Sequence, residues 1–201
     1  LEMREVLEEI LTHSDRIDVE TRDAIHRYTK LFWLNTGPFN NLTARKYVLD
    51  IDPAAFQVAV HAAAEDGAVF PLKEGESLDE LLMRLEPMFF DESFDPIVTN
   101  KTPAEGMDML LSSSNNLYNG VSMEDVTSFD EQYPLNSRLV KREGILEEEV
   151  YRINEDGRYA NQLREVVRHL EAAVPFATPE MAAALNALVQ WYRTGEPADR
   201  R

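Results

Sequence analysis

Hydrophobic residues recur every three or four positions over most of this chain, which is the spacing typical of amphipathic helices. The pattern predicts helices at 1–13, at 19–34, from Asp52 to about Asp66, and across about 158–174. Further helices are expected to start at Ser77, Thr102 and Thr178. Ser77 and Thr102 each begin a capping-box pattern, in which a hydroxyl and a carboxylate three positions later satisfy free backbone groups. In the helix at 19–34 a wide apolar face that includes Tyr28, Leu31, Phe32 and Trp33 predicts a central place in the core.

One segment departs from helical spacing. From Leu139 to Ile153 apolar residues flank Gly144 without a period of three or four, which favours a strand, a turn and a second strand. A second turn is expected at Asn154–Gly157, and the acidic residues of 91–95 are expected to face water. The predicted fold class is therefore α+β, predominantly helical with a small β-hairpin or sheet element.

Composition narrows the classes of function. The 201 residues are 44% hydrophobic and carry a net charge of -17, enough to bury one substantial core or two small ones. So strong a negative charge disfavours nucleic acid and anionic membranes as partners. Without cysteine there is no disulfide framework or thiol chemistry. No membrane-spanning stretch or leader is visible, and a cytoplasmic protein is the best fit.

The residues alone nominate no catalytic site and no metal site. A zinc-peptidase helix needs two histidines one turn apart with a glutamate between them, and the four histidines of this chain are widely separated. His61 with Glu65, and Glu165 with His169, have the spacing of half a metal site, but an ordinary surface pair on a helix explains them better. His26 is expected to pack or hydrogen-bond at the edge of the core.

Several polar and glycine-containing strings resemble the early part of dipeptidyl peptidase III proteins. The strings that carry the resemblance are 28–41, 45–48, 117–125, 135–141, 149–152 and 158–160. In that family an Asn-x-Gly loop leads to a Lys-Phe/Tyr-Val strand, matched by Lys46-Tyr47-Val48. The family's hydroxyl-Met-Glu-Asp segment, which begins a helix, is matched from Ser122, and Arg158-Tyr159-Ala160 opens a helix much as an aspartate-tyrosine-alanine segment does in relatives. Phe39 and Asn40 depart from the family, because several relatives have other aromatic and polar residues after Gly-Pro. The order and spacing agree across roughly residues 25 to 201.

The resemblance implies a two-lobed zinc exopeptidase that releases dipeptides from the N-termini of short peptides. Residues 1–201 would then be a single N-terminal fragment that begins the lower lobe, without the catalytic zinc lobe. No catalytic residue, metal ligand or cofactor is expected in this chain, whereas zinc is expected in the full-length parent. Its partners would be the missing catalytic lobe and, in the parent, the peptide substrate. Tyr118 matches an aromatic position on the substrate cleft, with Asn119 and Gly120 beside it.

Two alternatives stay open at this level. The parent could be of the type fused to Nudix domains, in which proteolysis can be lost. The chain could instead be a stand-alone acidic module that binds a peptide or protein without hydrolysis. Tyr118 itself could be either a peptide contact or core packing. If the chain is a fragment, apolar patches are expected at the helices that carry Trp33 and Trp191.

Overall fold

The computed structural model describes residues 1–134, 136–154 and 157–200. They form two compact units, Leu1–Thr99 and Asn100–Arg201. Helices dominate, and the described strands form one small sheet, so the predicted α+β class is confirmed. No helix of the described residues is both long and apolar enough to cross a membrane. That residues 1–201 are the N-terminal fragment of a longer protein stays a prediction.

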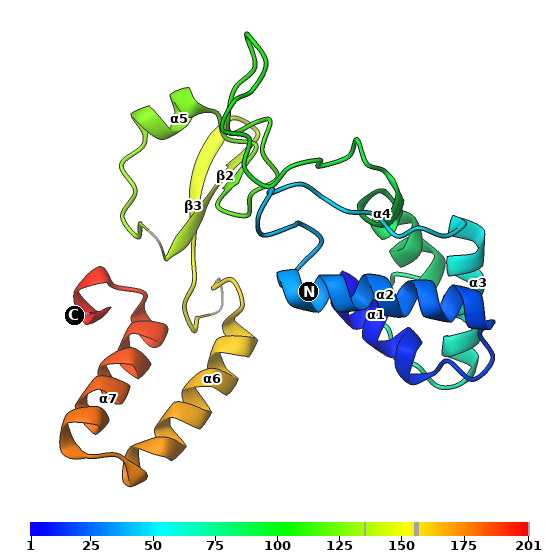
Figure 1. Ribbon diagram of the computed structural model, residues 1–201. Coiled ribbons are helices and arrows are strands. Elements are labelled where there is room, and N and C mark those ends of the chain that lie inside the picture. The colour runs from blue at the N-terminus through cyan, green and yellow to red at the C-terminus, as the bar shows by residue number, and fades with distance from the viewer. Residues whose placement is uncertain (135, 155–156, 201) are drawn as a thin grey trace. The chain divides into compact units, whose positions relative to one another are not determined.

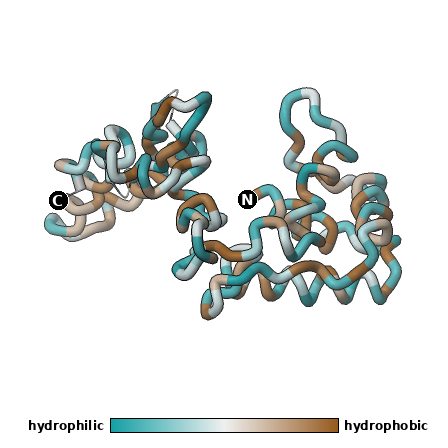
Figure 2. The backbone as a smooth tube through the Cα atoms, turned by 90° about the horizontal axis from the view of Figure 1, so that it is seen from above, coloured by the Kyte–Doolittle hydropathy of each residue, from teal (hydrophilic) through white to brown (hydrophobic). Residues whose placement is uncertain are grey.

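The first unit contains the helices α1 (Glu2–Thr12), α2 (Val19–Asn35), α3 (Pro53–Glu65) and α4 (Leu78–Phe90) (Figure 1). Their starts follow from local chemistry. The carboxylates of Asp18 and Asp52 accept backbone N–H groups at the starts of α2 and α3. At α4, Ser77 and Glu80 form the predicted capping box. Figure 2 shows apolar and hydrophilic stretches alternating along these helices, as amphipathic packing requires.

The core of the first unit is aromatic at its centre. The rings of Phe56 and Phe89 lie 4.9 Å apart, and the ring of Tyr28 lies 6.0 Å from Phe89. Around them lie Met3, Val6, Leu7, Ile10, Ile17, Ile25, Phe32, Leu49, Ala59, Val60, Leu81, Leu82 and Leu85. The prediction that Leu31 and Trp33 belong to the core face of α2 is wrong. Both are 46% exposed, because they lie on the side of the helix away from this cluster.

The loop after α2 holds its shape through backbone contacts rather than through a strand. Lys46 pairs with Phe39 in one isolated bridge, and Arg45 pairs with Ile97 in another. The resemblance implied a strand at Lys46–Val48, and the structure has only these bridges there. Tyr47 donates its hydroxyl to the carbonyl of Gly37 at 2.5 Å.

The second unit is built around a three-stranded sheet in the order β1-β2-β3. Its elements are β1 (Tyr118–Asn119), α5 (Met123–Ser128), β2 (Ser137–Arg142), β3 (Ile145–Val150), α6 (Ala160–Ala173), the 3-10 turn η1 (Val174–Phe176), α7 (Pro179–Thr194) and the 3-10 turn η2 (Pro197–Arg200). β2 and β3 form the predicted hairpin, antiparallel with Leu139 opposite Glu148. β1 runs parallel to β2, with Tyr118 beside Leu139.

The helix predicted from Thr102 is absent from this part of the described chain, which has no helix or strand between Asn100 and Leu117. Gly106 ends the turn with φ +81°, a conformation that cannot continue a helix. Asp108 then fixes the following loop, since its carboxylate accepts N–H groups from Leu110, Leu111 and Met123. A capping-box pattern therefore fails where a left-handed glycine follows within one turn.

Helices α6 and α7 form an antiparallel hairpin (Figure 1). Gly195 ends α7 with φ +75°, and a methyl group there would lie 2.8 Å from Val150 Cγ1. Its carbonyl accepts from the buried Asn136 Nδ2 at 3.2 Å, which ties the end of α7 to the start of β2. The turn predicted at Asn154–Gly157 includes residues 155 and 156, which lie outside the described residues, as does residue 135 of the matched strings.

Candidate functional site

Tyr118, Asn119 and Gly120 lie at the open side of the sheet in the second unit. Tyr118 and Asn119 are β1, which is an edge strand because only β2 pairs with it among the described strands. Tyr118 is half-buried, whereas Asn119 and Gly120 are exposed. Successive strand residues point to opposite faces, so Tyr118 shares the face of Leu139, and Asn119 shares that of Val140. The three residues are contiguous in the chain, but their side chains do not form one surface.

The hydrogen bonds define which main-chain groups of β1 face outward. Leu139 N–H donates to the carbonyl of Leu117 at 2.8 Å, so Leu117 and Asn119 direct their backbone groups toward β2. Tyr118 directs its groups to the opposite, outer side. There its N–H donates to Oδ1 of Asn115 at 2.8 Å. Asn115 thus occupies the position that the carbonyl of an added strand would take.

The side chain of Tyr118 is partly buried and partly exposed to solvent. Burial, together with the nearby charge of Glu131, raises the pKa of its phenol. The hydroxyl is therefore neutral at physiological pH, and a hydrogen bond with Glu131 engages it. Whether Tyr118 contacts a peptide or only packs against the sheet stays a prediction.

Gly120 leads from the edge strand into α5, and charge contacts fix this junction. Its φ of +67° favours glycine, and a methyl group would lie 3.4 Å from the carbonyl of Lys141. Ser122 and Asp125 form a capping box at α5, so the predicted helix start is confirmed. Lys141 donates from β2 to both oxygens of Asp125, at 2.7 and 2.9 Å. This hydrogen bond from Lys141 lowers the pKa of Asp125 to about 2.

The histidines do not assemble into a metal site within the described residues, where no group of three His, Asp or Glu side chains could hold an ion. His61 contacts Asp79 at 2.9 Å, while Glu65 pairs with Arg16. Glu165 pairs with Arg168, so both half-sites take part in surface pairs. His26 is exposed, which contradicts its expected place at the edge of the core, because it lies on the outer side of α2. The described residues therefore do not fit a zinc centre, and no catalytic step follows from them.

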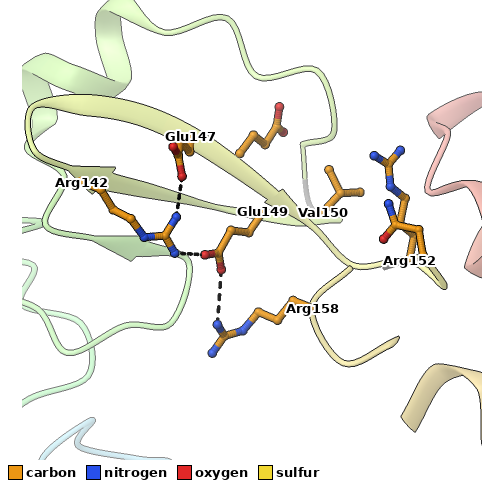
Figure 3. A pocket seen from close by; sticks show the side chains of 8 residues that line it. Arg142, Glu147, Glu149, Val150, Arg152 and Arg158 are labelled. Atoms are coloured by element: carbon orange, nitrogen blue, oxygen red, sulfur yellow. Dashed lines mark hydrogen bonds and ion pairs between the residues drawn. The ribbon is translucent and has the colours of Figure 1, made fainter. Parts of the chain in front are cut away.

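A charged pocket that the sequence did not indicate lies against β3. It encloses about 530 Å³ and is lined by Arg142, Glu147, Glu148, Glu149, Val150, Arg152, Asn154 and Arg158. Figure 3 shows Arg142 between Glu147 and Glu149, with Arg158 reaching Glu149 from the loop after β3. The signal in the sequence was the even spacing of Arg138 and Arg142 on β2 and of Glu147 and Glu149 on β3, which places each pair on one face of its strand. The two pairs share a face only because the register places Arg138 opposite Glu149.

Glu149 is the centre of this pocket. Its Oε2 accepts from Arg138 Nε at 2.5 Å and from Arg158 Nη1 at 3.3 Å, while its Oε1 accepts from Arg142. Three guanidinium groups thus meet at one carboxylate, of which the side chain is 20% exposed. The hydrogen bond from Arg138 is the main cause that lowers the pKa of Glu149 to about 2. Glu149 is therefore ionised throughout the neutral range.

Comparison with the models of known protein families and with curated proteins gives no match for this chain. The resemblance to dipeptidyl peptidase III proteins accordingly remains a prediction from the short strings described above.

Proposed function

We propose that this chain is the non-catalytic N-terminal portion of a zinc-dependent dipeptidyl peptidase, in which the edge strand β1 contributes to the peptide-binding cleft. Tyr118, Asn119 and Gly120 are the proposed substrate-binding residues, and the zinc site belongs to a lobe outside this chain. We also propose that the protein is cytoplasmic and that its full-length parent removes dipeptides from the N-termini of oligopeptides.

One observation carries the peptide-binding part of the proposal. β1 is an edge strand whose outward N–H, that of Tyr118, is held by a side-chain oxygen of Asn115 rather than by another strand. An extended peptide can join such an edge by exchanging main-chain hydrogen bonds, with side-chain contacts adding selectivity. A peptide carbonyl would replace the Asn115 oxygen, and the half-buried ring of Tyr118 would lie beside the neighbouring peptide side chain.

The test is the binding of a tetra-alanine peptide to the purified chain, followed by the amide shifts of residues 115–120 in NMR spectra. Tyr118→Ala is expected to weaken binding about fivefold or more, since a partly buried aromatic contact is lost. Phe176→Ala is the matched control, because Phe176 is 91% exposed at the turn between α6 and α7 in the same unit. Equal binding by the two variants would mean that Tyr118 only packs against the sheet and does not contact the peptide.

Hydrolysis provides a separate test. The purified chain is expected to release no dipeptides from short peptides, as measured by mass spectrometry, with or without added zinc. Release that a chelator abolishes would contradict the assignment as a non-catalytic portion.

A stand-alone acidic peptide- or protein-binding module is the second candidate. It is favoured by the same edge strand, which could hold a peptide without any metal. The two candidates differ in the native protein, so its intact mass in the source cells separates them. A mass well above 23.0 kDa, with a downstream peptide that contains the two-histidine zinc helix, supports the peptidase. A native mass near that of this chain supports the module.

A further inference from the structure

Three arginines and three glutamates line the charged pocket on β3, and Arg138 contacts Glu149 as a further cation. Arg138, Arg142 and Arg158 surround Glu149, and the other carboxylate in contact with them is Glu147, which pairs with Arg142. Glu148 lines the pocket but is engaged elsewhere, since it accepts from Gln132 N–H, Tyr133 N–H and Ser137 Oγ. Three guanidinium groups thus face two carboxylates, in a chain whose overall charge is -17.

Arg152 offsets the charge of Glu148, which also lines the pocket. Among the described residues Arg152 donates to the carbonyl of Thr194, at 3.3 Å, and lies over the ring of Tyr133, at 5.5 Å. It lines the pocket beyond Val150 (Figure 3). Four arginines, Arg138 included, thus meet three glutamates around this pocket, and a local excess of one positive charge favours an anionic ligand.

The arginines differ in how firmly they are held. Arg138 is the anchor, with a side chain only 14% exposed and a 2.5 Å bond to Glu149. Arg158 is the loosest partner, at 3.3 Å from Glu149, and its side chain is 33% exposed. Arg142 is 50% exposed. Each guanidinium carries five N–H groups, so Arg142 and Arg158 keep donors for a ligand while Arg138 continues to neutralise Glu149.

We propose that this pocket binds an oxyanion, a carboxylate or a phosphate group, between Arg142 and Arg158. The planar guanidinium fork matches both groups in geometry, and paired N–H donors make such contacts strong. Arg158 would turn from its long contact with Glu149 to the ligand. The proposal is independent of peptide binding at β1, because Arg142 and Arg158 are distinct from Tyr118, Asn119 and Gly120.

The experiment titrates the whole chain with three probes: N-acetyl-alanyl-alanine with a free carboxylate, its C-terminal amide, and inorganic phosphate. Arginine Nε–H signals in NMR spectra report binding directly. We expect the signals of Arg142 and Arg158 to shift with a Kd of about 10 mM or below, and the amide to give no shift. Tighter binding of the peptide acid identifies a carboxylate ligand, and tighter binding of phosphate identifies a phosphate group; either supports the site.

Two variants with opposite expected effects test the assignment. Arg158→Gln removes a donor and is expected to weaken binding about tenfold. Glu147→Gln removes a competing carboxylate from Arg142 and is expected to strengthen binding severalfold. Arg193→Gln is the control for Arg158, because it makes the same charge change at an exposed arginine whose partner is Glu171.

Three results would overturn the proposal: no shift with either anion up to the same concentration, equal weakening by Arg158→Gln and Arg193→Gln, or no strengthening by Glu147→Gln. Glu147 is 51% exposed, so its substitution keeps the test valid even if Arg158→Gln impairs folding.

Discussion

The two units of this chain are stabilised in different ways. Leu1–Thr99 has a continuous apolar core with the rings of Tyr28, Phe56 and Phe89 at its centre. In Asn100–Arg201 the buried hydrophobic residues of the described chain are Val121, Leu139, Val140, Val150, Val167 and Val189, with no aromatic residue among them. The second unit relies instead on directed contacts of charged and polar side chains.

Those contacts join different elements of the second unit. Lys141–Asp125 joins β2 to α5, Arg138–Glu149 joins β2 to β3, and Asn136 joins the start of β2 to Gly195. Apolar burial depends little on direction, whereas hydrogen-bonded ion pairs depend on geometry. The first unit therefore depends mainly on buried apolar area, whereas the second also depends on a few directed contacts, of which Lys141–Asp125 and Arg138–Glu149 hold only while both partners are charged. The proposed binding features also lie in the second unit.

The largest expected effect is on the first unit. Phe89→Ala should reduce the free energy of unfolding of that unit by about 3–5 kcal/mol, because it removes a ring that is 1% exposed and contacts Tyr28, Phe56 and Phe90. The chain has two tryptophans, Trp33 in α2 and Trp191 in α7. Urea unfolding followed by Trp33 fluorescence in a Trp191→Phe background therefore reports on the first unit.

The control for Phe89 is Val58→Ala, since Val58 is 69% exposed on α3 and should change the free energy of unfolding by less than about 0.5 kcal/mol. In a Trp33→Phe background, Trp191 should show an unchanged midpoint for the second unit in Phe89→Ala. A matching loss at Trp191 would contradict the view that each unit is stabilised by its own contacts.

The next effect is expected in the second unit. Glu149→Gln should cost about 2–3 kcal/mol, because it leaves the largely buried Arg138 without its charge partner. Urea unfolding followed by Trp191 fluorescence measures this loss. Glu165→Gln on α6 is the control; it breaks a pair in which both side chains are more than 60% exposed and should change stability by about 0.5 kcal/mol or less. Similar losses in the two variants would mean that the Glu149 cluster contributes no more than a surface pair.

The same contrast explains what the sequence could predict. Helices at 1–13, 19–34 and from Asp52 and Ser77 follow from apolar spacing and caps, which are local properties, and the structure confirms them. The hairpin at β2 and β3 was also predicted correctly, because strand residues flank a glycine turn. The helix expected from Thr102 was wrong, since the contacts of Asp108 with a segment up to fifteen positions away decide that loop.

The sites divide in a similar way. Tyr118–Gly120 could be nominated only through a resemblance of short strings, and their opposite side-chain directions became visible only with the pairing of β1 and β2. The arginine pocket was missed because it depends on a register that joins residues 11 positions apart and on a loop that returns Arg158 to Glu149. The positions of these arginines and glutamates in the sequence do not reveal which side chains form ion pairs in the folded chain.

The last and smallest expected effect is a loss of folding stability in acid. The pKa of Glu149 is about 2 in the folded chain against an ordinary 4.5. A carboxyl whose pKa is lowered by folding stabilises the fold above its unfolded pKa, and this contribution disappears as the pH falls through the folded pKa. Stability from Glu149 should thus be constant from pH 7 to about 5 and decline between about pH 4.5 and 2. Asp125, which has a lowered pKa of about 2 as well, acts in the same direction in the same unit.

The first unit also has such carboxylates, since hydrogen bonds from Arg84 lower the pKa of Glu76 to about 2, and other hydrogen bonds lower the pKa of Glu8, Asp18, Glu80 and Asp91. The urea midpoints reported by Trp33 and by Trp191 should therefore both fall when the pH is lowered from 5 to 2.5. In Glu149→Gln the fall at Trp191 should become shallower, because the substituted side chain no longer binds a proton. An unchanged acid profile at Trp191 in Glu149→Gln would show that the charge of Glu149 does not contribute to the stability of the second unit.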